Sequence, residues 1–166
     1  LNDKKLDPAY RWPARLPRIV ELVKHCDPDI IGIQELQAHQ VEEMMEFLVD
    51  SYVFYGVGQT DWDQKGEHNG FLLRLERFEV IDKMILSMSD WAYDPSASPG
   101  EKFSRTLTVL HLKDVKTGKD VIVGNAHFSF SSLEARQFQA QFVADYFAKL
   151  NPQISQVFMG DLNTFP

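Results

Sequence analysis

Three apolar segments of the sequence each end in polar side chains that can bind a metal ion or a phosphate group. Glu35 follows the first segment, His127 the second, and Asp161 with Asn163 the third. A carboxylate at the carboxyl end of a buried strand is well placed at a crevice of an α/β sheet. Each feature alone is also an ordinary one, namely a solvated carboxylate, a structural histidine or an Asx turn. Their occurrence at three separate strand ends favours a common site.

These residue types define the chemistry that such a site can support. His127 can donate a hydrogen bond to a phosphate, act as a base or bind a metal ion. Asp161 and Asn163 lie two residues apart, so their side chains point the same way if the backbone stays extended. Gly160 lets the backbone turn sharply just before them. The set is therefore suited to binding a phosphate group or a metal ion.

Seven short segments predict the strands that would hold these side chains. They are rich in β-branched and aromatic residues and cover residues 29–34, 52–57, 70–75, 78–86, 106–112, 120–125 and 156–159. The first of them is a continuous apolar run, which is typical of a strand covered on both faces. Thr117-Gly118 predicts a hairpin turn between the fifth and sixth strands.

Three helices are expected between some of these strands. The first covers residues 15–26, and the second covers residues 39–50. A third begins at Ser131, which forms a capping box with Glu134, and ends near residue 150. The spacing of apolar residues in the first helix predicts one buried face, formed by Ile19, Leu22, Val23 and Cys26. Helices between consecutive hairpins predict an α/β protein with layered sheets.

Composition and charge restrict the class of protein. The 166 residues, 44% apolar and 25% charged, fit a single globular domain. No apolar run reaches the roughly 18 residues of a membrane span, so we expect a soluble protein without a transmembrane segment, and a monomer. The single Cys26 excludes an intramolecular disulfide and a cysteine-based zinc site. A cytoplasmic location is favoured, but secretion stays open because the sequence begins at Leu1 rather than Met.

The net charge of −7, from 17 basic and 24 acidic residues, argues against a protein that binds long duplex nucleic acid. Such proteins usually carry a basic surface, and no cluster of Lys or Arg predicts one here. An acidic protein can still act on phosphates if bound metal ions supply the positive charge. If the site acts on phosphates, this charge favours a small phosphoester or the end of a nucleic acid over long duplex DNA.

The three segments together, residues 28–35, 125–127 and 160–163, resemble the endonuclease/exonuclease/phosphatase superfamily in order and spacing. This group includes DNase I, apurinic/apyrimidinic endonucleases, inositol polyphosphate 5-phosphatases, neutral sphingomyelinases and deadenylases. The similarity covers nearly the whole chain, and four further residues also fit the family pattern: Trp12, Arg15, Arg105 and Arg136. The resemblance implies a DNase I-like four-layer α/β sandwich, with two β-sheets flanked by helices, and a divalent-metal-dependent phosphoester hydrolase, either a phosphodiesterase, a nuclease or a phosphatase.

The resemblance also implies a role for each candidate residue. Glu35 corresponds to the ligand of Mg²⁺, with Mn²⁺ as a possible substitute. Asp161 corresponds to the residue that orients or deprotonates the attacking water, and Asn163 helps to hold phosphate and metal. His127 corresponds to the histidine that stabilises the phosphate in the transition state, although Ala126 replaces the usual Thr before it. Arg105 is a candidate phosphate contact, and a structural salt bridge is the alternative reading of this residue.

Two elements of the family pattern are absent from the sequence. One is a first strand that carries an Asn, and the other is a C-terminal Ser-Asp-His segment. Asn2 lies near the first gap, but its neighbours form no apolar strand, so it receives no role. We therefore expect residues 1–166 to form a single domain of this type that lacks its first strand and its C-terminal part. By itself such a fragment should show little activity.

Other functions remain open. A non-catalytic binding or regulatory module on the same fold is the main alternative, and a parent protein without the C-terminal Asp-His would favour it. A metal-independent hydrolase that uses His127 with a carboxylate is a third, and it would stay active in EDTA. Aromatic residues in the two long loops, residues 59–69 and 88–104, can stack on a base or a sugar or can simply pack: Trp62, Trp91, Tyr93 and Phe103.

Overall fold

The computed structural model describes residues 5–164, which form three α-helices and seven β-strands. Asn2 lies outside the described residues. After a short 3-10 helix (Pro8–Tyr10), the order is α1 (Trp12–Cys26), β1 (Ile30–Leu36), α2 (Ala38–Leu48), β2 (Tyr52–Gly58), β3 (His68–Arg74), β4 (Phe78–Ser87), β5 (Thr106–Asp114), β6 (Asp120–His127), α3 (Leu133–Ala148) and β7 (Ser155–Asp161).

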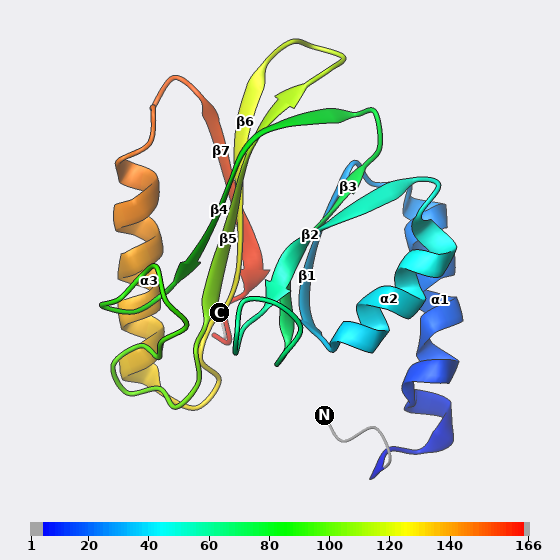
Figure 1. Ribbon diagram of the computed structural model, residues 1–166, viewed down its shortest axis with the longest axis horizontal. Helices are drawn as coiled ribbons and strands as arrows, with labels where there is room; N and C mark the ends of the chain where they lie inside the picture. The colour runs from blue at the N-terminus through cyan, green and yellow to red at the C-terminus, as the bar shows by residue number, and fades with distance from the viewer. Residues whose placement is uncertain (1–4, 165–166) are drawn as a thin grey trace.

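The strands form two sheets that face each other between two layers of helix (Figure 1). One sheet has three antiparallel strands in the order β1-β3-β2. The other has four in the order β4-β5-β6-β7, and its last pair, β6 and β7, is parallel. Helices α1 and α2 cover the outer face of the three-stranded sheet, and α3 covers the outer face of the four-stranded one. The α/β layering expected from the sequence is thus confirmed.

Three apolar clusters fill the three gaps between these four layers. Between the helices α1 and α2 and their sheet lie Trp12, Leu16, Val20, Ile33, Met44, Leu48, Tyr52 and Leu72. Between the two sheets lie Phe71, Leu73, Leu110, Leu112 and Val123. Between the four-stranded sheet and α3 lie Leu86, Met88, Leu107, Val109, Ile122, Ala126, Phe128 and Val143. Because successive side chains of a strand point to opposite faces, β3 supplies Leu72 to one cluster and its neighbours to another.

All seven predicted strands are present, and most extend one or two residues beyond the expected limits. The turn after β5 also forms as expected, since the amide of Gly118 donates to the carbonyl of Asp114 and Gly118 has a positive φ of 69°. β1 contributes apolar side chains to the clusters on both of its faces, as its continuous apolar run predicts. No helix within residues 5–164 is long and apolar enough to cross a membrane.

The predicted buried face of the first helix was only partly right, because Ile19 and Val23 pack against the core but Leu22 and Cys26 do not. Leu22 is 60% exposed and Cys26 is also exposed, whereas Trp12, Leu16 and Val20 are buried. The helix begins three residues earlier than expected, at Trp12 with Pro13 in its first turn. The observed apolar stripe consists of Trp12, Leu16 and Val20, with Ile19 and Val23 packed beside them.

The start of the third helix also differs from the prediction. Its N-cap is Ser132 rather than Ser131, and the Ser132 hydroxyl accepts a hydrogen bond from the amide of Ala135. The capping box therefore does not form, because the residue three positions after the cap is Ala135 and not Glu134. The helix itself ends at Ala148, close to the expected limit.

Candidate active site

The predicted polar residues at three strand ends lie together at one end of the molecule. His127 closes β6, and Asp161 closes the parallel neighbour β7, where the two residues are paired in register. Glu35 comes from β1 in the other sheet. The Nε2 atom of His127 lies 3.8 Å from Oε1 of Glu35 and 3.9 Å from Oδ2 of Asp161. Two carboxylates therefore flank one imidazole across the gap between the sheets.

A local irregularity in β1 sets the position of Glu35. Ile33 pairs with Gly70 and Leu36 with His68, so β1 has one more residue than β3 between these two pairs. Glu35 also has a positive φ of 66°, in the left-handed region that side chains other than glycine rarely adopt. Bulges of this kind change the direction in which a side chain points, and they are common beside active sites. Here the bulge lies directly at the carboxylate.

Gly160 allows β7 to approach β6 just before Asp161. A Cβ atom on this residue would collide with the backbone of Ala126, and its φ of 147° is rarely adopted by other residues. After the strand, Oδ1 of Asp161 accepts a hydrogen bond from the backbone amide of Asn163 at 2.9 Å. The side-chain amide of Asn163 donates to the carbonyl of Phe128 at 2.9 Å. Asn163 is thus held beside the end of β6, two residues from Asp161.

A buried arginine determines the tautomer of His127. Arg105 is 3% exposed, and its NH1 group lies 3.1 Å from Nδ1 of His127. A guanidinium can only donate hydrogen bonds, so Nδ1 accepts and the proton of the neutral ring lies on Nε2. Burial, followed by the charge of Arg105, lowers the pKa of His127, against the opposing effect of Glu35 and Asp161. The Nε2 atom, which carries this proton, is the one that lies near the two carboxylates, at 3.8 and 3.9 Å, so its N–H remains available to donate to a ligand.

Glu67, which was not predicted from the sequence, is a further charged residue next to Arg105. Its Oε2 lies 3.8 Å from the Arg105 guanidinium. Arg105 thus lies between a carboxylate and an imidazole, and it reaches the site through His127. Direct contact between Arg105 and a phosphate stays a prediction. The only sequence signal for Glu67 was its place in a long polar loop.

A second set of buried polar residues joins the two sheets next to the site. Asn125 is fully buried, and its amide nitrogen lies within hydrogen-bond distance of the carbonyls of Ile33 and Gly70 and of Oδ1 of Asn69. Its own Oδ1 accepts a hydrogen bond from Gln34 at 2.6 Å. The network ties β1, which carries Glu35, and β3 to β6, which carries His127.

The donor set fits a hard divalent cation. Mg²⁺ prefers oxygen ligands, keeps several waters and is usually held by only one or two carboxylates. The side chains of Glu35 and Asp161 are each 51% exposed, so both can coordinate an ion that also holds water. Within residues 5–164, no group of three or more His, Cys, Asp or Glu side chains forms a metal cluster. The arrangement therefore fits an ion with one or two protein ligands rather than a closed cage.

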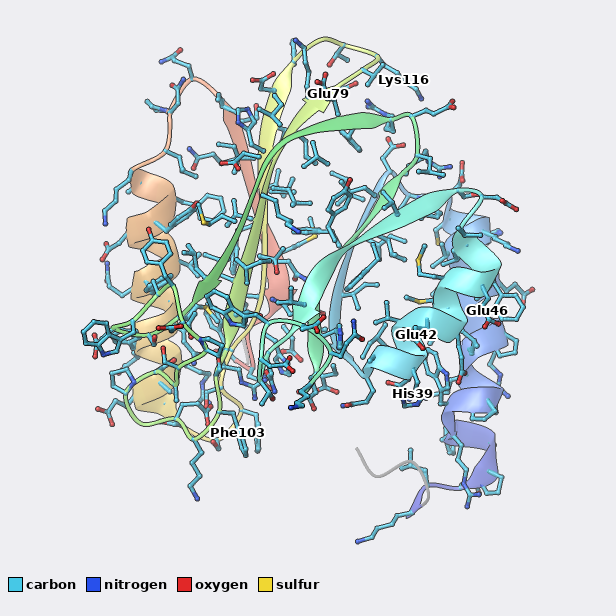
Figure 2. All side chains as sticks on the ribbon, in the orientation of Figure 1. His39, Glu42, Glu46, Glu79, Phe103 and Lys116 are labelled. Carbon is cyan, nitrogen blue, oxygen red and sulfur yellow. The ribbon has the colours of Figure 1, made fainter. Side chains whose placement is uncertain are left out.

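The sequence also predicted roles for two arginines and for aromatic residues of the long loops, and their surroundings differ. Arg15 lines a cavity of about 190 Å³ together with Glu35 and His39. Arg136 lies in the first turns of α3, and its guanidinium donates to the carbonyl of Ser129 in the segment before the helix. The loop aromatics Trp91 and Tyr93 are each 77% exposed. Phe103 is 56% exposed and lies near the lower end of α3 in Figure 2.

Fold and site together define a class of α/β protein, in which two facing sheets bring carboxylates and a histidine together at strand ends. The profile described as "Endonuclease/Exonuclease/phosphatase family" matches residues 4–166, and the chain belongs to this family. The predicted resemblance is therefore confirmed. The members of this family are phosphoester hydrolases. No curated protein matched the sequence.

Several solved structures share this fold. A mannosyl-6-phosphatase of Bacteroides thetaiotaomicron has 29% identity and a TM-score of 0.90 over 94% of this chain and 59% of its own. An endonuclease/exonuclease/phosphatase family protein of the same organism has 30% identity and a TM-score of 0.87, over 92% of this chain and 56% of its own. TDP2 of D. rerio, solved with a single-stranded DNA product, shares the fold at 17% identity and a TM-score of 0.75, over 99% of this chain and 58% of its own. The chain thus spans less than two thirds of each of these structures.

Proposed function

We propose that the chain carries the larger part of the active site of a divalent-metal-dependent phosphoester hydrolase. The observation that carries this proposal is the meeting of Glu35 and Asp161 at the Nε2–H side of His127. Carboxylates beside a neutral imidazole donor suit a reaction in which negative charge on phosphate oxygens must be neutralised. Family membership supports the reaction class.

Each residue has a proposed role. Glu35 binds the cation, Mg²⁺ or Mn²⁺, which when bound supplies positive charge for the phosphate oxygens and lowers the pKa of water. Asp161 orients the attacking water and accepts its proton. His127 donates its Nε2 proton as a hydrogen bond to a phosphate oxygen, and Asn163 holds the same group. Arg105 keeps His127 in the tautomer that this role requires.

The proposed substrate is a small phosphoester or the end of a nucleic acid rather than long duplex DNA. The net charge of −7 opposes extended contact with a polyanion. A phosphatase of mannosyl 6-phosphate groups is among the similar structures, and this favours a phosphomonoester. A TDP2 structure with bound DNA product keeps a nucleic-acid end as the second candidate.

We further propose that residues 1–166 are one part of the catalytic domain. The chain corresponds to 59% and 56% of the lengths of the two Bacteroides structures. Residues from the remaining part would complete the site in the whole protein. A non-catalytic module on the same fold remains the alternative function.

A panel of phosphoesters tests the reaction class. The intact protein would be assayed on p-nitrophenyl phosphate, bis-p-nitrophenyl phosphate and a short single-stranded oligonucleotide, each with Mg²⁺, with Mn²⁺ and with excess EDTA. We expect hydrolysis of at least one substrate that stops in EDTA and returns when Mg²⁺ is added. Activity that persists in EDTA would support the metal-independent alternative. Absence of hydrolysis in every assay would support the non-catalytic module.

A further inference from the structure

Gln139 is a fully buried polar residue of α3 that contacts two different segments of the chain. Its Oε1 accepts a hydrogen bond from the backbone amide of Ser129 at 2.8 Å, and its Nε2 donates to the hydroxyl of Ser98 at 2.8 Å. Ser129 belongs to the segment between β6 and α3. Ser98 belongs to the long loop between β4 and β5, which lies beside α3 (Figure 1). One side-chain amide therefore joins these two segments.

The first of these segments directly follows the candidate histidine. Ser129 comes two residues after His127, and it is also fully buried. Its carbonyl accepts a hydrogen bond from the guanidinium of Arg136 at 3.0 Å, and its hydroxyl accepts one from the amide of Ser132 at 3.2 Å. Arg136 and Gln139 lie three residues apart, which places them on the same face of α3. Both side chains thus hold the backbone that leaves β6.

The second segment leads to Arg105 through a short chain of hydrogen bonds. The hydroxyl of Ser98 donates to the carbonyl of Met88 at 2.5 Å, and the amide of Met88 donates to the carbonyl of Arg105 at 2.8 Å. All three residues are buried, and none is more than 3% exposed. Because these groups are shielded from water, a partner lost at either step is not replaced by bulk solvent. The position of Arg105 therefore depends on the loop that Gln139 holds.

The hydrogen bond between Arg105 and His127 is sensitive to small displacements of these two segments. The pairing of β5 with β6 ends at Leu107 and Ala126. Arg105 and His127 lie just beyond that last pair, so their positions depend on the contacts of the loop and of the segment before α3. NH1 of Arg105 lies 3.1 Å from Nδ1 of His127. A relative shift of about 0.5 Å would lengthen this distance to about 3.6 Å, which is no longer a hydrogen bond.

We propose that Gln139 is a positioning residue, which acts through Ser129 and Ser98 to hold Arg105 and His127 in the geometry of their hydrogen bond. In this way α3, which contributes no side chain to the cluster of Glu35, His127 and Asp161, fixes the tautomer of the histidine. The effect of Gln139 on the rate rests on the proposed hydrolase function, whereas its effect on the His127 ring can be measured without turnover. The two can therefore fail separately.

The tautomer of His127 tests the positioning role directly. Two-bond ¹H–¹⁵N NMR spectra at mildly alkaline pH distinguish the neutral tautomers of histidine, and His127→Gln identifies the His127 signals by their absence. The intact protein would be compared with Gln139→Met and with Gln141→Met, the same substitution at an exposed position of α3. We expect the Nε2–H tautomer alone in the native protein and the control, and a detectable Nδ1–H tautomer in Gln139→Met. The Nε2–H tautomer alone in a folded Gln139→Met protein overturns the proposal.

A double-mutant cycle separates positioning from a loss of stability. Gln139→Met should lower kcat about tenfold, at a temperature where circular dichroism shows the variant to be folded. In the Arg105→Met background the same change should lower kcat less than about twofold, because its effect passes through Arg105. A tenfold fall in both backgrounds would show that Gln139 acts elsewhere, and it overturns the proposal. A native protein without phosphoesterase activity refutes the hydrolase, and the NMR comparison then decides the positioning role alone.

Ser98→Ala covers the case in which Gln139→Met does not fold. This change removes the hydroxyl that joins Gln139 to the Met88 carbonyl and leaves α3 unaltered. We expect the Nδ1–H tautomer of His127 to appear in this variant too, and kcat to fall about two- to tenfold, the value of one hydrogen bond. The Nε2–H tautomer alone, together with a native kcat, in folded Ser98→Ala would refute the positioning role.

Discussion

The substitution Asn125→Asp tests whether the buried amide network holds the two sheets together beside the site. The two side chains have nearly the same shape, so the change removes hydrogen-bond donors without creating a cavity. In the native protein the amide nitrogen of Asn125 lies 2.9 Å from the Ile33 carbonyl, 2.6 Å from the Gly70 carbonyl and 2.9 Å from Oδ1 of Asn69. A carboxylate there would face three oxygens, and the side chain is fully buried.

The expected loss of stability follows from the number of donors removed. Two N–H groups are lost, and each buried acceptor left without a partner costs about 1–3 kcal/mol. We therefore expect the free energy of unfolding of Asn125→Asp to fall by about 2–6 kcal/mol, a large share of the roughly 5–15 kcal/mol of a typical domain. Burial of the new carboxyl group adds to this loss, because it must either stay protonated or bring an unpaired charge into the interior.

Urea unfolding, followed by circular dichroism at neutral pH, measures this loss. Asn151→Asp is the matched control, since Asn151 is exposed and its side-chain oxygen only accepts from the amide of Gln153. That control should stay within about 0.5 kcal/mol of the native protein. An Asn125→Asp variant that is equally close to the native value would refute the role assigned to the network.

Further predictions concern the other supports of the site. Arg105→Met should lower kcat about 10–100-fold, because the tautomer of His127 is no longer fixed. Arg105→Lys should recover part of the rate. Equal kcat values for the native protein and both variants in a steady-state assay would contradict this prediction. Gly160→Ala should lower both melting temperature and kcat, because its Cβ atom collides with the backbone of β6; a thermal shift assay with unchanged values would count against it. The pKa of Asp114 lies well below its usual range because Arg77 donates a hydrogen bond to it. The ionised carboxylate therefore stabilises the fold above about pH 4. This stabilisation is lost as the pH falls toward the lowered pKa. Asp114→Asn should therefore be less stable at neutral pH and lose less stability on acidification, as urea unfolding at several pH values would show.

The predicted positions of Glu35, His127 and Asp161 came from one regular feature, the polar residue that ends an apolar strand. Strand ends were enough to predict that His127 and Asp161 are neighbours, because the parallel register of β6 and β7 places them opposite each other. The direction of Glu35 could not be predicted, since it depends on a bulge and a positive φ angle that no residue in the segment signals. The buried face of α1 was also predicted only in part, because Ile19 and Val23 are compatible both with the observed stripe through Leu16 and Val20 and with the predicted one through Leu22 and Cys26.

The supporting residues were the least predictable part of the site. Glu67 and Arg105 are far apart in sequence, and their meeting depends on the packing of one sheet against the other. Asn69 and Asn125 lie within otherwise apolar strands, so each reads as an isolated polar residue until the sheets are assembled. Such partners are set by tertiary contacts, which periodicity and local propensity do not encode.

The central claim is that Glu35 and Asp161 act together in metal-dependent hydrolysis, and kcat of the Asp161→Asn variant tests it most directly. The rate would be measured on the best substrate of the panel with saturating Mg²⁺, beside Glu35→Gln and the exposed control Asp145→Asn. The account predicts a fall of about 10²–10⁴-fold for Asp161→Asn, a fall of similar order for Glu35→Gln, and a native rate for Asp145→Asn. An Asp161→Asn protein that turns over at close to the native rate would contradict the assigned site.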